Sequence, residues 1–121
     1  MNAVRALRGA TTVENDTADE IHERVAELLI ALLDANGLEP ANVISALFSA
    51  TPDIRSAYPA PAARAVGWSD VAMVCFQEMA VEGSLPRCIR VILHFAAPDD
   101  RALKHVYLRG ARGLRPDWQE K

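Results

Sequence analysis

Hydrophobic side chains recur with a helical period between Thr17 and Gly37. They stand three or four residues apart, a spacing that places them on one face of a helix. The Thr17 hydroxyl can cap the first turn, and Glu20 can reach back to the backbone amide of the cap. Asn36 and Gly37 provide a left-handed stop. The pattern predicts a helix over roughly residues 18–35, with a buried stripe of Ile21, Val25, Leu28, Leu29, Leu32 and Leu33.

Shorter apolar segments, bounded by residues typical of turns, predict about five strands. The first alternates between apolar and polar residues and leads into a predicted loop over residues 9–16. The last is short, and no regular pattern follows Gly110. The predicted strands are residues 3–8, 43–50, 71–77, 88–95 and 105–108.

A second, short helix is predicted for the alanine-rich segment from Pro59 to Val66, because proline is tolerated in a first helical turn. Residues 40–42 predict a single turn. A length of 121 residues fits one domain spanning residues 1–121. The predicted fold class is therefore α+β, with a mixed sheet packed on one long and one short helix.

Several of the predicted strands are apolar on both faces. In the second strand Val43 and Leu47 alternate with Ile44 and Phe48, and residues 71–76 show the same pattern. One long and one short helix can cover only one face of a sheet, and every apolar face needs cover. We therefore expect an obligate oligomer of closed symmetry, in which sheets pack face to face.

The overall charge and the cysteine content exclude several classes of protein. The net charge of −3 gives no general reason to bind nucleic acid or an anionic membrane. The longest strongly apolar stretch, residues 28–33, is too short to span a membrane, and residues 1–10 do not resemble a signal peptide. Cys75 and Cys88 lie in apolar runs, which indicates reduced thiols in a cytoplasmic protein.

Arginine supplies 11 of the 13 cationic side chains, and a few of these stand where a sheet should be apolar. Arg90 is alone among apolar neighbours on a strand, so it either pairs with a carboxylate, reaches water at the strand edge or binds an anion. Arg8 ends the first strand, where an ordinary surface arginine is the plainer reading. Glu78 can share a site with Cys75 only if the strand bends or ends near Gln77; the alternative is that Glu78 begins a loop and is solvated.

Other candidate chemistry in the sequence is weaker. Tyr58 and Arg64 could present an aromatic ring and a cation together, although Tyr58 and Tyr107 also suit packing roles. The three histidines have no metal-ligand spacing, so no metal is expected. The chain has no glycine-rich phosphate loop and no serine in a Gly-x-Ser-x-Gly elbow. A thiol on an apolar strand, such as Cys75, is usually inert.

Six segments in order resemble the AroH-class monofunctional chorismate mutases, over about residues 4–118. None is specific alone, but together they match the family in order and spacing. They are Arg8-Gly9-Ala10-Thr11-Thr12-Val13-Glu14, Ser49-Ala50-Thr51-Pro52-Asp53, Cys75-Phe76-Gln77-Glu78-Met79, Arg87-Cys88-Ile89-Arg90-Val91, His105-Val106-Tyr107-Leu108 and Leu114-Arg115-Pro116-Asp117.

The resemblance implies a homotrimer that forms a pseudo-α/β-barrel, with active sites at the subunit interfaces. It implies the Claisen rearrangement of chorismate to prephenate in phenylalanine and tyrosine biosynthesis. This reaction is pericyclic and requires no cofactor. A second hypothesis, from a different class, is a non-catalytic trimeric module that binds a small carboxylate ligand.

The resemblance also implies roles for individual residues. Arg90 would face the breaking ether bond, Glu78 would accept from the ring hydroxyl, and Arg8 would hold a carboxylate. Tyr107 would add a hydroxyl donor, and Val74 to Glu78 would form one wall of the site. The full expected set is Arg8, Tyr58, Ala60, Arg64, Val74, Cys75, Phe76, Gln77, Glu78, Arg90, Tyr107, Leu114 and Arg115.

One position departs from the family pattern. Members often carry a lysine after the aromatic-Pro-Ala turn, whereas Pro61 stands here. We expect weaker substrate binding, or compensation by Arg64 or Arg115, rather than loss of the chemistry.

Overall fold

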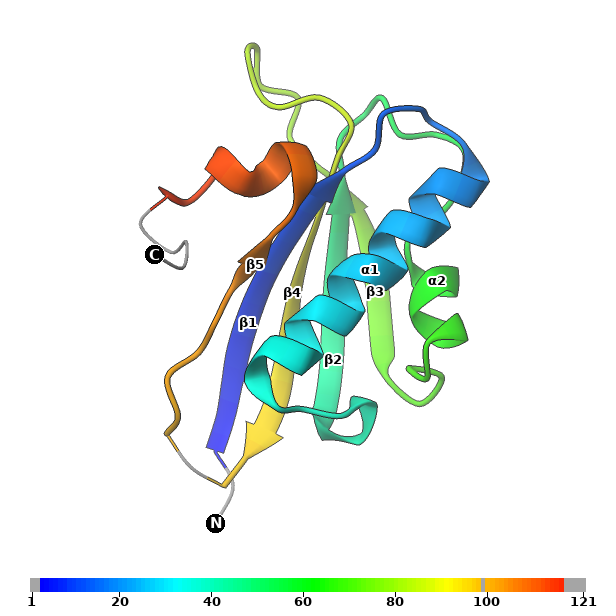
Figure 1. Cartoon of the computed structure of the whole chain (residues 1–121). Coiled ribbons are helices and arrows are strands. Elements are labelled where there is room, and N and C mark those ends of the chain that lie inside the picture. The colour runs from blue at the N-terminus through cyan, green and yellow to red at the C-terminus, as the bar shows by residue number, and fades with distance from the viewer. Residues whose placement is uncertain (1–2, 99, 117–121) are drawn as a thin grey trace.

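The computed structural model describes residues 3–98 and 100–116, and its centre is a five-stranded sheet (Figure 1). The strands lie in the order β3-β2-β4-β1-β5. β4 is antiparallel to β1 and β2, whereas the pairs β2–β3 and β1–β5 are parallel. The strands are β1 (Ala3–Thr12), β2 (Val43–Ala50), β3 (Ala72–Gln77), β4 (Cys88–Ala97) and β5 (Val106–Tyr107). The predicted mixed sheet is thus confirmed.

Two α-helices and two 3₁₀ turns complete the described structure. Both helices lie on the same face of the sheet (Figure 1). The long helix, the short helix and the single turn at residues 40–42 all agree with the sequence prediction, whereas the second 3₁₀ turn was not predicted. These elements are α1 (Ala18–Asn36), η1 (Pro40–Asn42), α2 (Ala60–Ala65) and η2 (Arg109–Gly113).

The helix α1 begins and ends largely as its sequence predicts. The Thr17 hydroxyl accepts from the Glu20 N–H at 3.2 Å, and Gly37 ends the helix at φ 63°. The predicted return bond from Glu20 is wrong, because the Thr17 amide donates to the Asn15 carbonyl instead. The Glu20 carboxylate accepts from the backbone N–H groups of Glu14 and Asn15, so it holds the β1–α1 loop.

The first strand is longer than predicted, because residues 9–12 continue β1 instead of forming a loop. Their backbone pairs with β4 on one side and with β5 on the other. Glycine suits this position of the strand because α1 crosses β1 closely here. Any Cβ at this position would lie 2.8 Å from Leu32 Cδ1 and 3.1 Å from the Val106 carbonyl. Glycine here therefore reflects close packing rather than a turn.

The core fills the space between the sheet and the helices. The stripe of α1 is buried against alternate residues of β4, among them Val91, Leu93 and Phe95, and against Leu7 and Phe48. The opposite face of the sheet, here called the open face, has neither α-helix over it (Figure 1), and only η2 packs on it at one end. Val74 and Phe76 remain 46% and 54% exposed on that face. Within the described residues, the two α-helices cover only one face of the sheet, as predicted.

Candidate active site

One row of residues crosses the open face through all five strands. The register pairs Phe76 with Ser49, Ser49 with Arg90, Arg90 with Ala10, and Ala10 with Tyr107. Side chains in one row of a sheet share a face. The sheet itself therefore brings Phe76, Arg90 and Tyr107 to the same side, although they come from distant parts of the chain.

Arg8 lies in the neighbouring row of the same face. It pairs in register with Ile92, which faces Leu47, and Leu47 faces Val74. Together with the row above, these residues border a cleft of about 410 Å³. The cleft is lined by Arg8, Leu47, Phe48, Ser49, Phe76, Glu78, Arg90, Val91 and Ile92.

Glu78 reaches this cleft because β3 ends at Gln77. Its backbone N–H donates to the Ala50 carbonyl at 2.8 Å, which turns the chain at the end of the sheet. The Glu78 Oε2 then lies 3.5 Å from the Arg90 Nε and accepts from the Ser49 hydroxyl at 2.5 Å. Both charged side chains are about 70% buried, at 29% and 28% exposure. β3 therefore ends near Gln77, as this position of Glu78 requires.

The Arg90 guanidinium keeps hydrogen-bonding capacity in this arrangement. Its buried Nε makes no hydrogen bond within residues 3–98 and 100–116, and the contact with Glu78 is an ion pair. Buried donors of this kind are rare unless a ligand uses them. A fixed cation beside a fixed carboxylate, on a half-buried surface, can stabilise charges that separate within a bound molecule.

A hydrogen-bond network fixes the start of β4, two residues before Arg90. The Asp53 carboxylate accepts the Arg87 N–H at 2.9 Å, and Arg87 has a left-handed φ of 46°. The Thr51 hydroxyl donates to Asp53 and accepts the Cys88 N–H at 2.9 Å. Burial raises the pKa of the Cys88 thiol, although the Arg90 charge opposes this effect. The network anchors the strand that carries Arg90.

His105 contacts the backbone of Arg8, which lines the cleft. Its Nδ1 accepts the backbone N–H of Arg8 at 3.0 Å. Burial, and then the charges of Arg8 and Arg115, lower the pKa of the imidazole below 6.5. Arg115 therefore lies close enough for its charge to act on the same ring.

Tyr107 is buried in a small cluster on the open face, where η2 packs against the sheet. This cluster also contains Ala10, Cys88 and Ala111, and Leu114 packs against it. The turn η2 is held by a bond from the Gly110 N–H to the Thr12 hydroxyl at 2.9 Å. Leu114 and Arg115 thus follow directly from a turn that is fixed to β1. Asp117, the last residue of the matched segments, lies outside the described residues.

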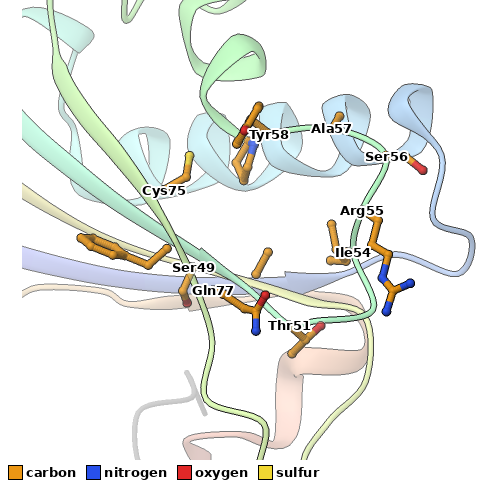
Figure 2. Close-up of a pocket in the computed structure, with 12 residues that line it drawn as sticks. Ser49, Thr51, Ile54, Arg55, Ser56, Ala57, Tyr58, Cys75 and Gln77 are labelled. Carbon is orange, nitrogen blue, oxygen red and sulfur yellow. The ribbon is translucent and has the colours of Figure 1, made fainter.

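A second cleft, of about 420 Å³, lies at the ends of β2 and β3 beside the 51–59 loop (Figure 2). Tyr58 and Cys75 point into it, and Gln77 lies at its rim (Figure 2). Tyr58 is 73% exposed. Ser49 and Phe76 border both clefts. Arg64 is exposed on α2, one turn after Ala60 and Pro61 begin that helix.

The expected site residues thus fall into two groups within one chain. The first group lies on the open face and beside it: Arg8, Val74, Phe76, Glu78, Arg90, Tyr107, Leu114 and Arg115. The second group lies at the second cleft and on α2: Tyr58, Ala60, Arg64, Cys75 and Gln77. Alternation along β3 separates them, because Cys75 packs toward the core while Val74 and Phe76 face outward.

Two residues of this site were not singled out from the sequence. In the sequence, Ser49 is a small residue within an apolar strand. Its place beside Arg90 follows only from the register of β2 and β4. Histidine is usually singled out in a sequence by metal-ligand spacing, and His105 lacks such spacing. Its role depends on a contact with the backbone of Arg8, 97 positions away.

Two further observations concern the described part of the chain. No three His, Cys, Asp or Glu side chains within it are grouped so that they could hold a metal ion. Neither of its helices is long and apolar enough to cross a membrane.

The fold is that of an α+β protein, and its open sheet face carries a cleft lined by two arginines and a glutamate. Comparison with known proteins specifies this class. The sequence model of the family "chorismate mutase type I" matches residues 4–118. The chain belongs to the chorismate mutase type I family.

Individual relatives agree with the family match. Two proteins named chorismate mutase AroH are similar over 117 residues. The one from Thermus thermophilus is 47% identical and covers 94% of this chain and 95% of the relative. The one from Bacillus subtilis (strain 168) is 44% identical, with 94% and 91% covered. The solved chorismate mutase from Clostridium thermocellum has a TM-score of 0.86 at 47% identity, covering 89% of this chain and 97% of that one.

Proposed function

We propose that this chorismate mutase converts chorismate to prephenate with Arg90, Glu78 and Arg8 as its catalytic residues. The observation that carries this assignment is the separation of 3.5 Å between Arg90 Nε and Glu78 Oε2, in the cleft that Arg8 also lines. The rearrangement breaks a C–O bond and forms a C–C bond within one molecule. It needs no nucleophile and no general base, so its catalysts are groups that stabilise separating charge.

Arg90 stabilises the negative charge that grows on the ether oxygen as the C–O bond breaks. Glu78 accepts a hydrogen bond from the ring hydroxyl and faces the part of the ring that becomes positive. Both groups are held before the substrate binds, since Ser49 fixes the Glu78 carboxylate and β4 fixes Arg90. Preorganised groups of this kind act on the transition state without a reorganisation cost.

Substrate binding is assigned to the surrounding residues. Arg8 holds a carboxylate of the enolpyruvyl side chain, and Tyr107 adds a hydroxyl donor at that end. Chorismate is a dianion, which suits an arginine-lined pocket in a chain of net charge −3. Binding of the reactive conformer adds an orientation effect to catalysis. Family members often have a lysine at the position of Pro61, and Arg64 or Arg115 supplies the positive charge in its place.

We further propose that two copies of the chain build each site, within a homotrimer shaped as a pseudo-α/β-barrel. The separation of the two residue groups supports this assembly, because one chain alone directs Cys75 and Tyr58 away from the open face. A neighbouring copy can bring its Tyr58–Arg64 segment to the first copy's Arg90. Exposed Val74 and Phe76 provide the apolar surface that such packing would bury. The unpaired thiols Cys75 and Cys88 suit a cytoplasmic location.

The decisive assay follows the loss of chorismate absorbance with purified protein and no added cofactor. Turnover to prephenate is expected. Binding of a dicarboxylate without turnover would instead favour the non-catalytic carboxylate-binding module. The comparisons do not favour that alternative, since both named relatives are chorismate mutases.

A further inference from the structure

We infer that His105 is a positioning residue for Arg8, acting as a neutral hydrogen-bond acceptor beside two arginines. The inference rests on the proposed role of Arg8 in holding a substrate carboxylate. It concerns a histidine that the rearrangement itself does not use, since no proton is transferred in that reaction.

The need for such a residue follows from the shape of the sheet. β5 contains only Val106 and Tyr107, which pair with Gly9 and Ala10. At Arg8 the described structure has no strand backbone on the β5 side of β1. The His105 ring takes this place, and its Nδ1 accepts the Arg8 N–H at 3.0 Å. A backbone N–H in a partly buried position is costly to leave without an acceptor.

The contact fixes the backbone from which the Arg8 side chain extends. On the opposite edge, β1 is held by its register with Ile92 of β4. Gly9, the next residue, is packed directly under Leu32 of α1. His105 therefore adds to these supports a hydrogen bond from a side chain to the Arg8 backbone.

The ring must be neutral to serve as this acceptor. With Nδ1 accepting, the proton of neutral imidazole is on Nε2. Two charged groups of the described residues act on the ring, Arg8 of β1 and Arg115 beyond η2, and both oppose its protonation. The adjacent Lys104 is held through its backbone N–H, which donates to the Asn36 side chain at 2.9 Å.

A neutral acceptor also leaves the arginine charge available to an anion. A carboxylate at residue 105 could accept the same N–H, but it would also attract the Arg8 and Arg115 guanidinium groups. The dianionic substrate would then compete with the protein's own anion. Histidine provides the hydrogen bond without this competition.

Three variants separate these effects in the steady-state conversion of chorismate. His105→Asn places a neutral oxygen near the position of Nδ1, and we expect kcat/KM within about twofold of the unmodified enzyme. His105→Leu removes the acceptor, and kcat/KM should fall about five- to tenfold. His105→Asp keeps an acceptor but adds charge, so KM should rise at least about fivefold over the Asn variant. Circular dichroism and the oligomeric state verify folding, and His105→Gln replaces His105→Leu if that variant fails to fold, because its amide oxygen reaches one bond too far.

Each result supports or overturns the inference. A leucine variant as active as the unmodified enzyme overturns the role of the acceptor. An asparagine variant as impaired as the leucine variant shows that ring shape, not the hydrogen bond, is needed. Equal KM values for the Asp and Asn variants overturn the requirement for neutrality. Absence of turnover by the unmodified enzyme would instead refute the proposed function itself, which keeps the two failures distinct.

Discussion

The Glu78 Oε2 lies 3.5 Å from the Arg90 Nε, although Glu78 follows β3 and Arg90 lies on β4, which is not a neighbour of β3 in the sheet. β2 lies between them, and its residue Ser49 joins the two. Ser49 is the register partner of Arg90, and its hydroxyl donates to the Glu78 carboxylate. The charge pair is therefore set by three strands and one turn, so its geometry depends on the sheet rather than on a mobile loop.

Replacement of Arg90 by alanine should lower kcat by about 10²–10³-fold or more, the range for one preorganised transition-state donor. The physical reason is the loss of the cation at the breaking C–O bond. Steady-state prephenate formation measures the effect. Arg112→Ala, which removes an exposed arginine of η2, is the matched control and should leave kcat unchanged. A rate for Arg90→Ala within about threefold of the unmodified enzyme would contradict the assigned role.

Replacement of Ser49 by alanine should lower kcat/KM about three- to tenfold, because the Glu78 carboxylate loses the hydroxyl that orients it. Ser49→Thr keeps the hydroxyl and should recover most of the activity. Both variants are measured with the chorismate assay, and thermal unfolding verifies that the sheet is intact. Equal losses in the two variants would indicate a packing effect instead of a hydrogen bond.

A charge on the open face should prevent assembly. Val74→Glu places a carboxylate on an apolar, 46% exposed position, where burial against a second copy would desolvate it. We expect a monomer in size-exclusion chromatography with light scattering, whereas the proposed assembly predicts a trimer for the unmodified chain. Ile30→Glu is the control, since Ile30 is 50% exposed on the helix α1. An intact trimer for Val74→Glu would exclude this face as the interface.

The activity should be independent of pH down to about 6.5 and fall at lower pH. Burial, then Arg8 and Arg115, hold the pKa of His105 below 6.5, so the ring keeps its acceptor above that value. The unfolded chain takes up the proton first, so the free energy of unfolding also decreases as pH falls from 6.5. A kcat/KM profile of the unmodified enzyme and of His105→Asn measures this. The acid decline should be absent in the variant.

Asp53 should contribute to acid stability. Burial alone would raise its pKa, but hydrogen bonds from the Thr51 hydroxyl and the Arg87 N–H outweigh burial and hold the pKa below 3.8. A lowered carboxylate pKa gives stabilisation that is complete above the unfolded value and is lost as pH falls through the folded value. Asp53→Asn should therefore lower Tm by a few degrees at neutral pH. The difference in Tm should shrink below about pH 3.8, and a constant difference would contradict this account.

The regular elements could be predicted where local pattern and tertiary packing agree. The stripe of α1 and its caps at Thr17 and Gly37 are local signals, and the structure confirms them. Residues 9–12 were predicted as a loop because Gly9 resembles a turn residue. Glycine there makes room for Leu32, which lies in a helix that the local sequence of β1 does not contain.

The charged residues of the candidate site could be predicted from the sequence, whereas the residues that position them could not. Arg90 is conspicuous as a single cation in an apolar strand, and Glu78 as a carboxylate at a strand end. Ser49 and His105 have no such contrast with their neighbours. Their roles arise from the strand order β3-β2-β4-β1-β5, which brings them to Glu78 and Arg8.

The packing of Gly9 under α1 has a consequence for mutational surveys of this enzyme. Substitution of residue 9 should destabilise the fold, since even the Cβ of alanine would require Leu32 to move. The tolerance profile of residue 9 would resemble that of its neighbour Arg8, although one position fails through steric conflict and the other through lost contact with an anion. Selection for growth alone would group the two, whereas thermal stability of the purified variants would separate a folding defect from a chemical one.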